Sequence, residues 1–502
     1  MKTKKDLSRR EFVKKTAVSG AAFSIVPAHV LGRSGRIAPS DKITLGIIGC
    51  GTQGISEMIN LLSQEDVQVV AVCDPNTEST DYVEWGKNQR RKGIRRVLGP
   101  TWMEGVNGVF GGRDLALKIV ETAYAKGSPS GSYKGCNAYS DFRELLEKQK
   151  DLDAVQIITP DHTHATISIA AMKKGKHVVM HKPIANRVYE ARLVDKIARE
   201  TGVATHCKGW TGRNLDLVKG WIQDGAIGTL REIHNWTPVP QWPQWPTYPT
   251  ETPPIPKGFD WDLWQGPVPD RPYHPNFTHA VYRGWYDYGA GAIADNGYYS
   301  LWPVFAAFNL GVPMSIEAST NYSSEIKDQI SSWHKEKVSY PLSCRIRFEF
   351  PANGEWAPIN LYWYDGGQKP PKPEELRMDG KDLKWTGLMF VGDKGIILDN
   401  EIIPEKKMSE YLEGKEVPQR ERRRGGGNSL WIDAFKGGSP SPGNFQNARN
   451  IAETICLAAV AMQANTLQSE RTIAWDSENL KITNIPEANE YLYREYRKGW
   501  EL

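Results

Sequence analysis

The sequence has few cysteines, no long apolar run and little surplus charge outside its first residues. Its six cysteines stand alone, and none falls in C-x-x-C spacing, so a zinc cluster or a redox pair is not expected and we predict no metal site. No stretch reaches the roughly 18 consecutive apolar residues that a membrane span needs. We therefore expect no membrane anchor. The cysteines are Cys50, Cys73, Cys136, Cys207, Cys344 and Cys456.

The net charge of +4 arises at the N-terminal end of the chain. Seven Lys and Arg residues and two acidic ones precede Pro27, so the rest of the chain carries one more negative charge than positive. A nearly neutral body offers no electrostatic surface for nucleic acid or an anionic membrane. A small molecule is the expected partner.

The first residues are typical of an export signal. Ser8-Arg9-Arg10-Glu11-Phe12-Val13-Lys14 precedes a weakly apolar stretch, residues 16–26, and the small-residue site Val26-Pro27-Ala28. Adjacent arginines in this setting mark the twin-arginine route. We interpret residues 1–40 as signal peptide and linker and expect a periplasmic or otherwise extracytoplasmic protein; the alternative is a frayed basic helix.

From residue 41 to residue 207, β-branched apolar runs alternate with amphipathic stretches. This alternation predicts a doubly wound parallel sheet with helices on both faces. The insert between Asp74 and Tyr139 is longer than a typical connection and is basic, then Gly-rich, so we interpret it as a solvated excursion, or else a lid or oligomer contact. Expected strands are 43–48, 67–72, 154–158, 177–180 and 204–207; expected helices are 141–149, 164–174 and 187–200.

A second domain, residues 208–502, has a different pattern. Residues 343–350 alternate between apolar and charged side chains, which predicts an antiparallel strand with one wet face. Residues 358–364 and 388–398 are its expected partners, the latter turning at Gly392-Asp393-Lys394-Gly395. The fold class is therefore α/β: an N-terminal Rossmann domain, residues 41–207, followed by an α+β domain with a largely antiparallel sheet. Residues 420–427 read as a loose loop, and residues 444–463 and 488–497 as segments packing back on the body.

The strongest motif is Gly49-Cys50-Gly51-Thr52-Gln53-Gly54, which directly follows the first expected strand and opens a helix. Glycines at these positions allow a tight turn, a close approach of backbone N–H groups to a pyrophosphate, and close helix–strand packing. The next strand ends in Asp74, where a carboxylate can accept hydrogen bonds from a ribose 2′-OH. It would repel a 2′-phosphate, so NAD is expected rather than NADP.

Two further loops lie at the carboxyl ends of expected strands, the edge at which open α/β sheets bind ligands. The first carries Thr159, Pro160, His162 and His164, and the second is His181-Lys182-Pro183. We predict that both loops face the cofactor.

With these residues the chain resembles the glucose–fructose oxidoreductase, inositol dehydrogenase and MocA-like family. The Gly-rich turn carries the resemblance, as do Asp141-Phe142-Arg143-Glu144-Leu145, Gly175-Lys176-His177-Val178, Lys182-Pro183 and Gly289 to Asp295. It implies a Rossmann domain joined to an open antiparallel sheet, which supplies the substrate pocket and a homo-oligomer interface. It also implies a catalytic lysine, often before a cis proline.

The resemblance assigns catalysis to Lys182, Asp295 and Tyr299. His181 replaces the glutamate that usually precedes the lysine, and Tyr299 stands where the family often has histidine. A tyrosine of pKa about 10 is a poor base, but a nearby ammonium lowers that pKa, and we expect Lys182 to do so. The alternative for Tyr299 is simple packing.

The stretch from Trp236 to Tyr288 is unusually aromatic and suits a carbohydrate surface, because flat rings pack against sugar C–H groups. Candidates for substrate contacts are Trp210, Arg283, Trp285, Tyr286 and Asp295, and Asp287 could hold a hydroxyl. Other candidate platforms are Trp242, Trp245, Trp261 and Trp264.

These residues predict an NAD-dependent oxidoreductase that transfers hydride to or from a sugar or polyol, with a retained cofactor. Tyr299 would take the hydroxyl proton, Lys182 would stabilise the oxyanion, and Asp295 would orient a neighbouring hydroxyl. Two alternatives stay open: a redox-neutral glycosidase or lyase using a transient keto-sugar, and a non-catalytic sugar-binding protein.

Overall fold

The computed structural model describes residues 39–335, 337–415, 427–467 and 472–502. The predicted export signal and most of the predicted loop at residues 420–427 lie outside these ranges. Residues 43–502 form one compact unit. The short helix η1 (Pro39–Asp41) precedes it.

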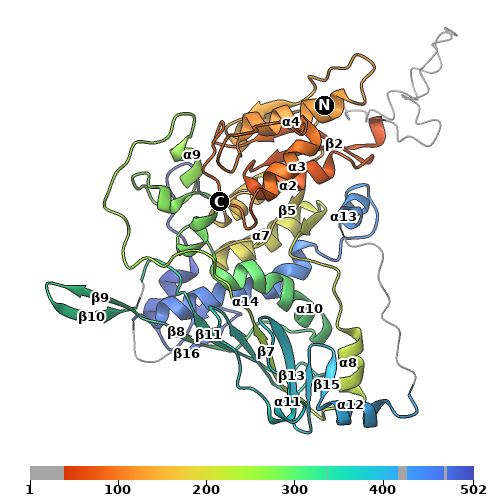
Figure 1. Ribbon diagram of the computed structural model, residues 1–502, viewed down its shortest axis with the longest axis vertical. Helices are drawn as coiled ribbons and strands as arrows, with labels where there is room; N and C mark the ends of the chain where they lie inside the picture. The colour runs from red at the N-terminus through yellow and green to blue at the C-terminus, as the bar shows by residue number, and fades with distance from the viewer. Residues whose placement is uncertain (1–38, 336, 416–426, 468–471) are drawn as a thin grey trace, which may run out of the picture. The chain divides into compact units, whose positions relative to one another are not determined.

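The first sheet has six parallel strands in the order β3-β2-β1-β4-β5-β6. It confirms the predicted Rossmann architecture, and its last strand ends at Cys207 (Figure 1). The strands are β1 (Ile43–Ile48), β2 (Val67–Cys73), β3 (Asn137–Tyr139), β4 (Ala154–Ile157), β5 (His177–Met180) and β6 (Thr205–Cys207).

Helices cover both faces of this sheet because its strands are apolar on both sides. On one face, α2 (Thr52–Leu61) packs on β1, α4 (Arg113–Ala125) on β2 and α13 (Asn428–Phe435) on β6. On the other face lie α5 (Phe142–Lys148), α6 (His164–Lys173) and α7 (Val188–Thr201). The side chain of Asp141 caps α5 by accepting a hydrogen bond from the Arg143 backbone N–H.

The insert between Asp74 and Tyr139 is more than a solvated excursion. It contains α3 (Gln89–Leu98) and α4, and α4 buries Leu115, Ile119 and Val120 against the sheet. Since β2 and β3 are parallel neighbours, α4 is the crossover helix that joins them. The interpretation as a surface excursion was wrong for this half of the insert.

The second sheet has nine strands in the order β15-β14-β13-β7-β12-β11-β8-β16-β17. All its pairings are antiparallel except β7 with β12, so the predicted, largely antiparallel second sheet is confirmed. Its strands are β7 (Leu230–Trp236), β8 (Ser315–Thr320), β11 (Cys344–Phe350), β12 (Ile359–Tyr364), β13 (Gly387–Gly392), β14 (Ile396–Leu398), β15 (Glu401–Ile403), β16 (Thr472–Asp476) and β17 (Lys481–Ile482). The separate hairpin is β9 (Ser323–Lys327) with β10 (Ile330–His334).

Two long helices connect the sheets. α14 (Phe445–Ala464) packs against α7 and β8, and α10 (Tyr298–Phe308) packs against α14 (Figure 1). The C-terminal tail reaches back to α7, where the buried Arg494 guanidinium bonds Glu190 at 2.9 Å. The remaining helices are η2 (Asp161–Thr163), α8 (Asp216–Gln223), α9 (Trp261–Gln265), η3 (Pro275–Phe277), η4 (His279–Gly284), η5 (Ile293–Gly297), α11 (Glu374–Met378), α12 (Glu405–Leu412) and η6 (Pro486–Leu492).

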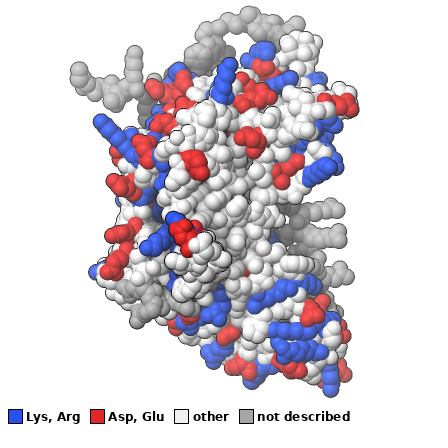
Figure 2. Space-filling model, turned by 60° about the vertical axis from the view of Figure 1, so that its left-hand side comes forward, with Lys and Arg blue, Asp and Glu red and all other residues white. Residues whose placement is uncertain are grey.

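Acidic and basic side chains are interspersed on the face in Figure 2, around a broad uncharged area across its middle. Among the described residues, no helix is both long and apolar enough to cross a membrane.

Candidate active site

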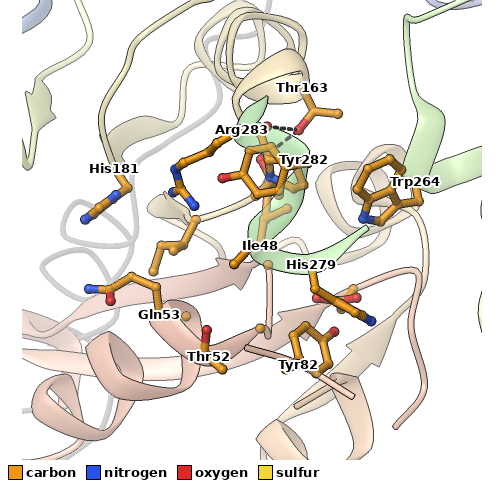
Figure 3. A pocket seen from close by; sticks show the side chains of 18 of the residues that line it. Ile48, Thr52, Gln53, Tyr82, Thr163, His181, Trp264, His279, Tyr282 and Arg283 are labelled. Atoms are coloured by element: carbon orange, nitrogen blue, oxygen red, sulfur yellow. Dashed lines mark hydrogen bonds between the residues drawn. The ribbon is translucent and has the colours of Figure 1, made fainter. Parts of the chain in front are cut away.

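A pocket of about 470 Å³ opens at the carboxyl ends of the first sheet's strands. One wall is the glycine-rich turn, and the opposite wall comes from the chain between Val239 and Tyr299 (Figure 3). Trp500, from the C-terminal tail, closes part of the rim beside Phe142. The predicted residues that line the pocket are Gly49, Gly51, Thr52, Gln53, Gly54, Asp74, Thr159, Pro160, His181, Lys182, Arg283, Asp295 and Tyr299.

The glycine-rich turn has the geometry of a dinucleotide cradle. Gly49 has φ +99°, and a Cβ there would lie 2.3 Å from the Ile158 carbonyl oxygen. A Cβ on Gly54 would lie 2.0 Å from the Gly49 carbonyl oxygen, so only glycine at this position lets the first turn of α2 pack this closely on the preceding loop. Gly51 caps α2 without a side-chain hydrogen bond, so the first-turn N–H groups face the pocket free for an anion. The residues present fit a dinucleotide pyrophosphate.

Asp74 ties this turn to the end of β2. Its buried carboxylate accepts hydrogen bonds from the backbone N–H of Cys50 at 2.6 Å and of Asn76 at 2.8 Å. Burial raises the pKa of Asp74, and the two amide hydrogen bonds oppose that rise. A carboxylate has about four acceptor sites, so two remain for ribose hydroxyls.

Lys182 and Asp295 form an ion pair at the other end of the pocket. Lys182 follows β5, its peptide bond to Pro183 is cis, and its side chain is only 2% exposed. The Nζ atom donates a hydrogen bond to Oδ1 of Asp295. Burial lowers the pKa of Lys182 and the charge of Arg283 lowers it further, whereas the charge of Asp161 acts in the opposite direction.

The chain around Asp295 has an unusual helical geometry. Residues Ile293–Gly297 form the π-helical turn η5, which runs directly into α10. Such turns often occur at functional sites. Because Asp295 and Tyr299 are four residues apart, the turn directs both side chains into the pocket beside Lys182.

Tyr299 is partnered by His181. Its hydroxyl lies 3.3 Å from Nε2 of His181, and Nζ of Lys182 lies 5.2 Å from the Tyr299 ring centroid. Burial raises the pKa of Tyr299, so the expectation that Lys182 lowers it was wrong: the ammonium faces Asp295 instead. Burial and the charge of Lys182 lower the pKa of His181 well below its usual range, which keeps this imidazole neutral at pH 7.

The two predicted cofactor histidines of the first loop lie behind the pocket wall. The ring nitrogens of His162 face the carbonyl oxygens of Tyr288 and Trp264, and burial lowers its pKa to about 3. His164 contacts the Pro183 and Thr159 carbonyl oxygens in the same way. Neither lines the pocket, so their predicted cofactor contact is wrong: they brace the two loops that bear Thr159 and Lys182.

Several predicted substrate residues are core instead. Trp285 stacks on Trp245 at 4.4 Å and donates its indole N–H to the Asn276 carbonyl, and Tyr286 packs on Tyr340. Trp210 packs edge-on against Trp302. None of Trp210, Trp285 and Tyr286 lines the pocket: Trp285 belongs to an aromatic cluster of its own, whereas Trp210 and Tyr286 pack in the main hydrophobic core.

The same stretch contributes two of its tryptophans to the pocket. Trp242 and Trp264 line it; Trp264 also belongs to the aromatic cluster, together with Trp261 and Trp245, which do not line the pocket. Asp287 also lies outside the lining, because its carboxylate accepts hydrogen bonds from Arg271 and from Tyr248, each at 2.6 Å.

The sequence analysis did not predict the residues that cover the glycine-rich turn. Tyr82, Trp85 and Arg90, from the insert, line the pocket, as does His279 from η4. Figure 3 shows Tyr82 and His279 side by side, with ring centroids 4.1 Å apart. The density of aromatic and basic residues between Asp74 and Arg91 was the available signal.

Main-chain hydrogen bonds join the two segments that cover the glycine-rich turn. The backbone N–H of Thr77 bonds the Gly258 carbonyl at 2.8 Å, and that of Asp260 bonds the Pro75 carbonyl at 3.0 Å. Nε2 of His279 lies 3.2 Å from the Asp81 carboxylate. We call the contacting segments, 75–82 and 258–279, the roof. Among the described residues, no cluster of three or more His, Cys, Asp or Glu side chains is placed to hold a metal ion.

The parallel sheet, the glycine-rich turn and the lysine-bearing loop define a Rossmann-type oxidoreductase. Residues 116–208 match the model of an oxidoreductase family's NAD-binding Rossmann fold, and residues 234–359 match that of the same family's C-terminal alpha/beta domain. The chain belongs to the Gfo/Idh/MocA oxidoreductase family, which confirms the resemblance.

Curated relatives match part of the chain. Levoglucosan dehydrogenase of Pseudarthrobacter phenanthrenivorans is 33% identical over 97 residues, 19% of this chain and 24% of the relative. Alpha-N-acetylgalactosaminidase of Shewanella oneidensis is 28% identical over 220 residues, 43% of this chain and 39% of the relative. The chain thus spans a quarter to two fifths of the relatives' lengths.

A solved structure matches over most of the chain. The WlbA dehydrogenase of Chromobacterium violaceum, in complex with NADH and UDP-GlcNAcA, has a TM-score of 0.50 and 14% identity. The match covers 88% of this chain and 98% of that one, and it shows a shared fold.

Proposed function

We propose that this protein is an NAD-dependent oxidoreductase that transfers hydride to or from a carbinol carbon of a sugar or polyol. One observation carries the proposal: the ion pair of the buried Lys182 with Asp295 and the tyrosine–histidine pair share one pocket with the glycine-rich dinucleotide cradle. Trp242 and Trp264 supply apolar faces for a sugar ring in the same pocket. When bound, the nicotinamide supplies the hydride acceptor or donor.

The protein's own groups handle the proton and the oxygen. The Tyr299 hydroxyl accepts the substrate's hydroxyl proton as it passes its own proton to the neutral Nε2 of His181. Because the tyrosine is never required to be a free phenolate, its raised pKa is no obstacle. Lys182 stabilises the developing oxyanion, and Asp295 holds the lysine in place.

NAD is the proposed cofactor, since Asp74 stands where a 2′-phosphate would otherwise lie. The WlbA dehydrogenase, which shares the fold, is an NADH complex. The roof supports cofactor retention, because Tyr82 and His279 contact each other and line the pocket beside the glycine-rich turn. Retention also suits the export predicted from Arg9 and Arg10, since a twin-arginine substrate can carry its cofactor across the membrane.

The second sheet is the surface on which we propose that two copies associate. His234 and Tyr362 stack on one of its faces with centroids 4.7 Å apart, and Tyr364 continues the row. Of these rings only Tyr362 is partly exposed, and it lies in a cluster with the partly buried apolar side chains of Val391, Ile396 and Leu398.

A redox-neutral glycosidase or lyase is the second candidate. It is favoured by the relative named as an alpha-N-acetylgalactosaminidase, and it uses the same pocket residues. The retained cofactor would then return its hydride to the same sugar, so that no net NADH forms.

The experiment is to purify the full chain, denature a portion and identify the released nucleotide by mass. The intact portion is then incubated with sugars and glycosides while reduced nicotinamide is followed by absorbance. A net change with a sugar supports the oxidoreductase, and glycoside cleavage without a net change supports the second candidate. If no nucleotide is present and added NAD neither binds nor turns over, both are wrong.

A further inference from the structure

We propose that Arg283 binds an anionic group of the substrate, so that the preferred substrate is a sugar bearing a carboxylate, phosphate or sulfate. This inference rests on the proposed function and adds the substrate's chemical class. It concerns a charge at the catalytic end of the pocket that the described part of the chain leaves unmatched.

Arg283 extends from η4 into the pocket. Figure 3 shows its guanidinium pointing toward the side on which His181 lies. Its one close contact is the face of Tyr282, with Cζ 4.8 Å from the ring centroid. Within the described ranges, no carboxylate lies within ion-pair distance of Arg283, and no protein acceptor takes a hydrogen bond from it.

Other arginines around this region have protein hydrogen-bond partners. Arg271 bonds Asp287, and Arg494 bonds Glu190 and Asn186. Arg187 donates to the carbonyl oxygens of Asn186 and Tyr286. Each of these guanidinium groups has a protein acceptor, whereas Arg283, which lines the pocket, has none among the described residues.

The nearby carboxylates are also occupied. Asp295 holds Lys182, and Asp141 holds Arg143 outside the catalytic end. Asp161, which lies behind the wall, accepts hydrogen bonds from the Tyr282 hydroxyl and the Ala290 backbone N–H, each at 3.1 Å. Burial acts to lower the pKa of Arg283, but Tyr282 and the Asp161 carboxylate raise it, so the cation is favoured although no carboxylate of the described residues lies within ion-pair distance of it.

Arg283 is partly exposed in the pocket, and its N–H groups, which have no protein acceptor among the described residues, are open to an incoming anion. Its planar N–H groups match the oxygens of a carboxylate, phosphate or sulfate in a bidentate arrangement. Arg283 stands near the reacting groups, since its charge acts on both His181 and Lys182. The cofactor's pyrophosphate belongs at the other end, beside α2 and Arg90, whose guanidinium bonds Gln53 at 3.2 Å.

The test compares binding to the NAD-loaded full chain without relying on turnover. The probes are D-glucose, D-glucuronate, D-glucose 6-phosphate and D-glucose 6-sulfate, with D-galactose and D-galacturonate as a second matched pair. Tryptophan fluorescence reports occupancy, because Trp242 and Trp264 line the pocket. We expect at least one charged sugar to bind at least tenfold more tightly than its neutral partner, about 1.4 kcal/mol, with a preference that weakens as salt is added.

Arg283→Met should abolish this preference, and Arg283→Lys should keep part of it. Arg345→Met is the matched control, because that side chain is 49% exposed on β11 outside the pocket. Circular dichroism and the bound NAD content check that each variant is folded and loaded. The three charged groups distinguish a carboxylate from a phosphate or a sulfate.

The inference is overturned if neutral sugars bind as tightly as charged ones, if no charged sugar binds at millimolar concentration, or if Arg283→Met keeps the preference. Loss of NAD from Arg283→Met with an unchanged sugar preference would assign Arg283 to the cofactor and also overturn it. Charged sugars that bind through Arg283 but never change the redox state of the nicotinamide would instead refute the proposed function alone.

Discussion

The Tyr299 hydroxyl lies 3.3 Å from Nε2 of His181. His181 lies in the loop after β5, and Tyr299 lies in the first turn of α10. Burial raises the pKa of the tyrosine and lowers that of the histidine. At pH 7 both groups are therefore neutral, which leaves the Nε2 lone pair of the imidazole open to the proton that the tyrosine passes on as it takes one from the substrate.

Removing either member of this pair should slow turnover strongly. Tyr299→Phe deletes the hydroxyl but keeps the ring, and we expect kcat to fall by about 10²–10⁴-fold, the usual worth of general acid–base catalysis. His181→Asn should slow the reaction less, because water can replace the imidazole. Single-turnover rates on NAD-loaded enzyme measure both. A nearly fully active Tyr299→Phe would show that the tyrosine only packs.

The same pair predicts the acid limb of the pH profile. Because the pKa of His181 lies well below 6.5, the imidazole stays neutral on moderate acidification, and activity should persist below the pH at which an ordinary histidine becomes charged. A loss of activity centred near the ordinary histidine pKa would contradict the proposed environment.

The next prediction concerns the ion pair of Lys182 and Asp295. Lys182→Ala should abolish turnover while NAD stays bound, because the lysine acts at the reacting oxygen. In Asp295→Asn the lysine loses the negative charge beside Nζ, so its pKa falls further and the ammonium is lost at lower pH. The alkaline limb of kcat should therefore shift toward acid, a change that a purely structural aspartate would not produce.

Cofactor choice depends on Asp74. NAD should bind more tightly than NADP by about 1–3 kcal/mol, the worth of hydrogen bonds to a charged group. Asp74→Ser should reduce the difference between the NAD and NADP affinities. It should also weaken the binding of both nucleotides, since the carboxylate accepts a hydrogen bond from the Cys50 backbone N–H and so helps to hold the glycine-rich turn. Isothermal titration of nucleotide-free protein measures both affinities, and equal affinities in the unaltered protein would refute the assignment.

The roof predicts slow cofactor release. Tyr82→Ala removes the ring that lies between Gly51 and His279, and it should speed NAD dissociation at least tenfold. Tyr322→Ala, an exposed tyrosine outside the pocket, is the control. Dilution and gel filtration followed by nucleotide quantification measure the release. Equal retention in Tyr82→Ala and the control would show that the roof does not hold NAD.

The cofactor end of the site could be predicted from sequence because its geometry is local. Gly49, Gly54 and Asp74 lie in one strand–turn–helix–strand unit, and Lys182 lies at the end of another strand of the same sheet. Parallel strands bring their carboxyl ends to one edge, so the topology places these residues together before any side-chain packing is known.

The substrate end could not be predicted to the same degree. Trp285 and Arg283 are two residues apart, yet Trp285 faces the aromatic cluster and Arg283 the pocket. His162 and Thr163 differ in the same way. Which side of an irregular segment faces a ligand depends on tertiary packing, and no periodic pattern encodes it. The roof was missed for the same reason, since it forms only where two distant segments meet.

A last prediction concerns stability in the second sheet. Asp365, at the end of β12, is buried, and burial raises its pKa to about 7 despite hydrogen bonds from the Trp363 indole N–H at 3.0 Å and the Cys344 backbone N–H at 2.7 Å. In the unfolded chain this carboxyl ionises near 3.8. Between these values the folded state holds a proton that the unfolded state has lost. This group's contribution to the free energy of unfolding is therefore largest below the lower value, and it declines as the pH rises through the window.

Asp365→Asn removes the titration while keeping a similar shape. The stability of the unaltered protein relative to this variant should fall by about 1.4 kcal/mol per pH unit at most as the pH rises from 5 to 7, and then level off. Urea unfolding midpoints at pH 5, 6, 7 and 8 measure the difference, and Asp382→Asn, whose side chain is 87% exposed, is the control. A difference that stays constant across this range would show that Asp365 is ionised in the folded protein. The hydrogen bonds from Trp363 and Cys344 would then be stabilising its negative charge.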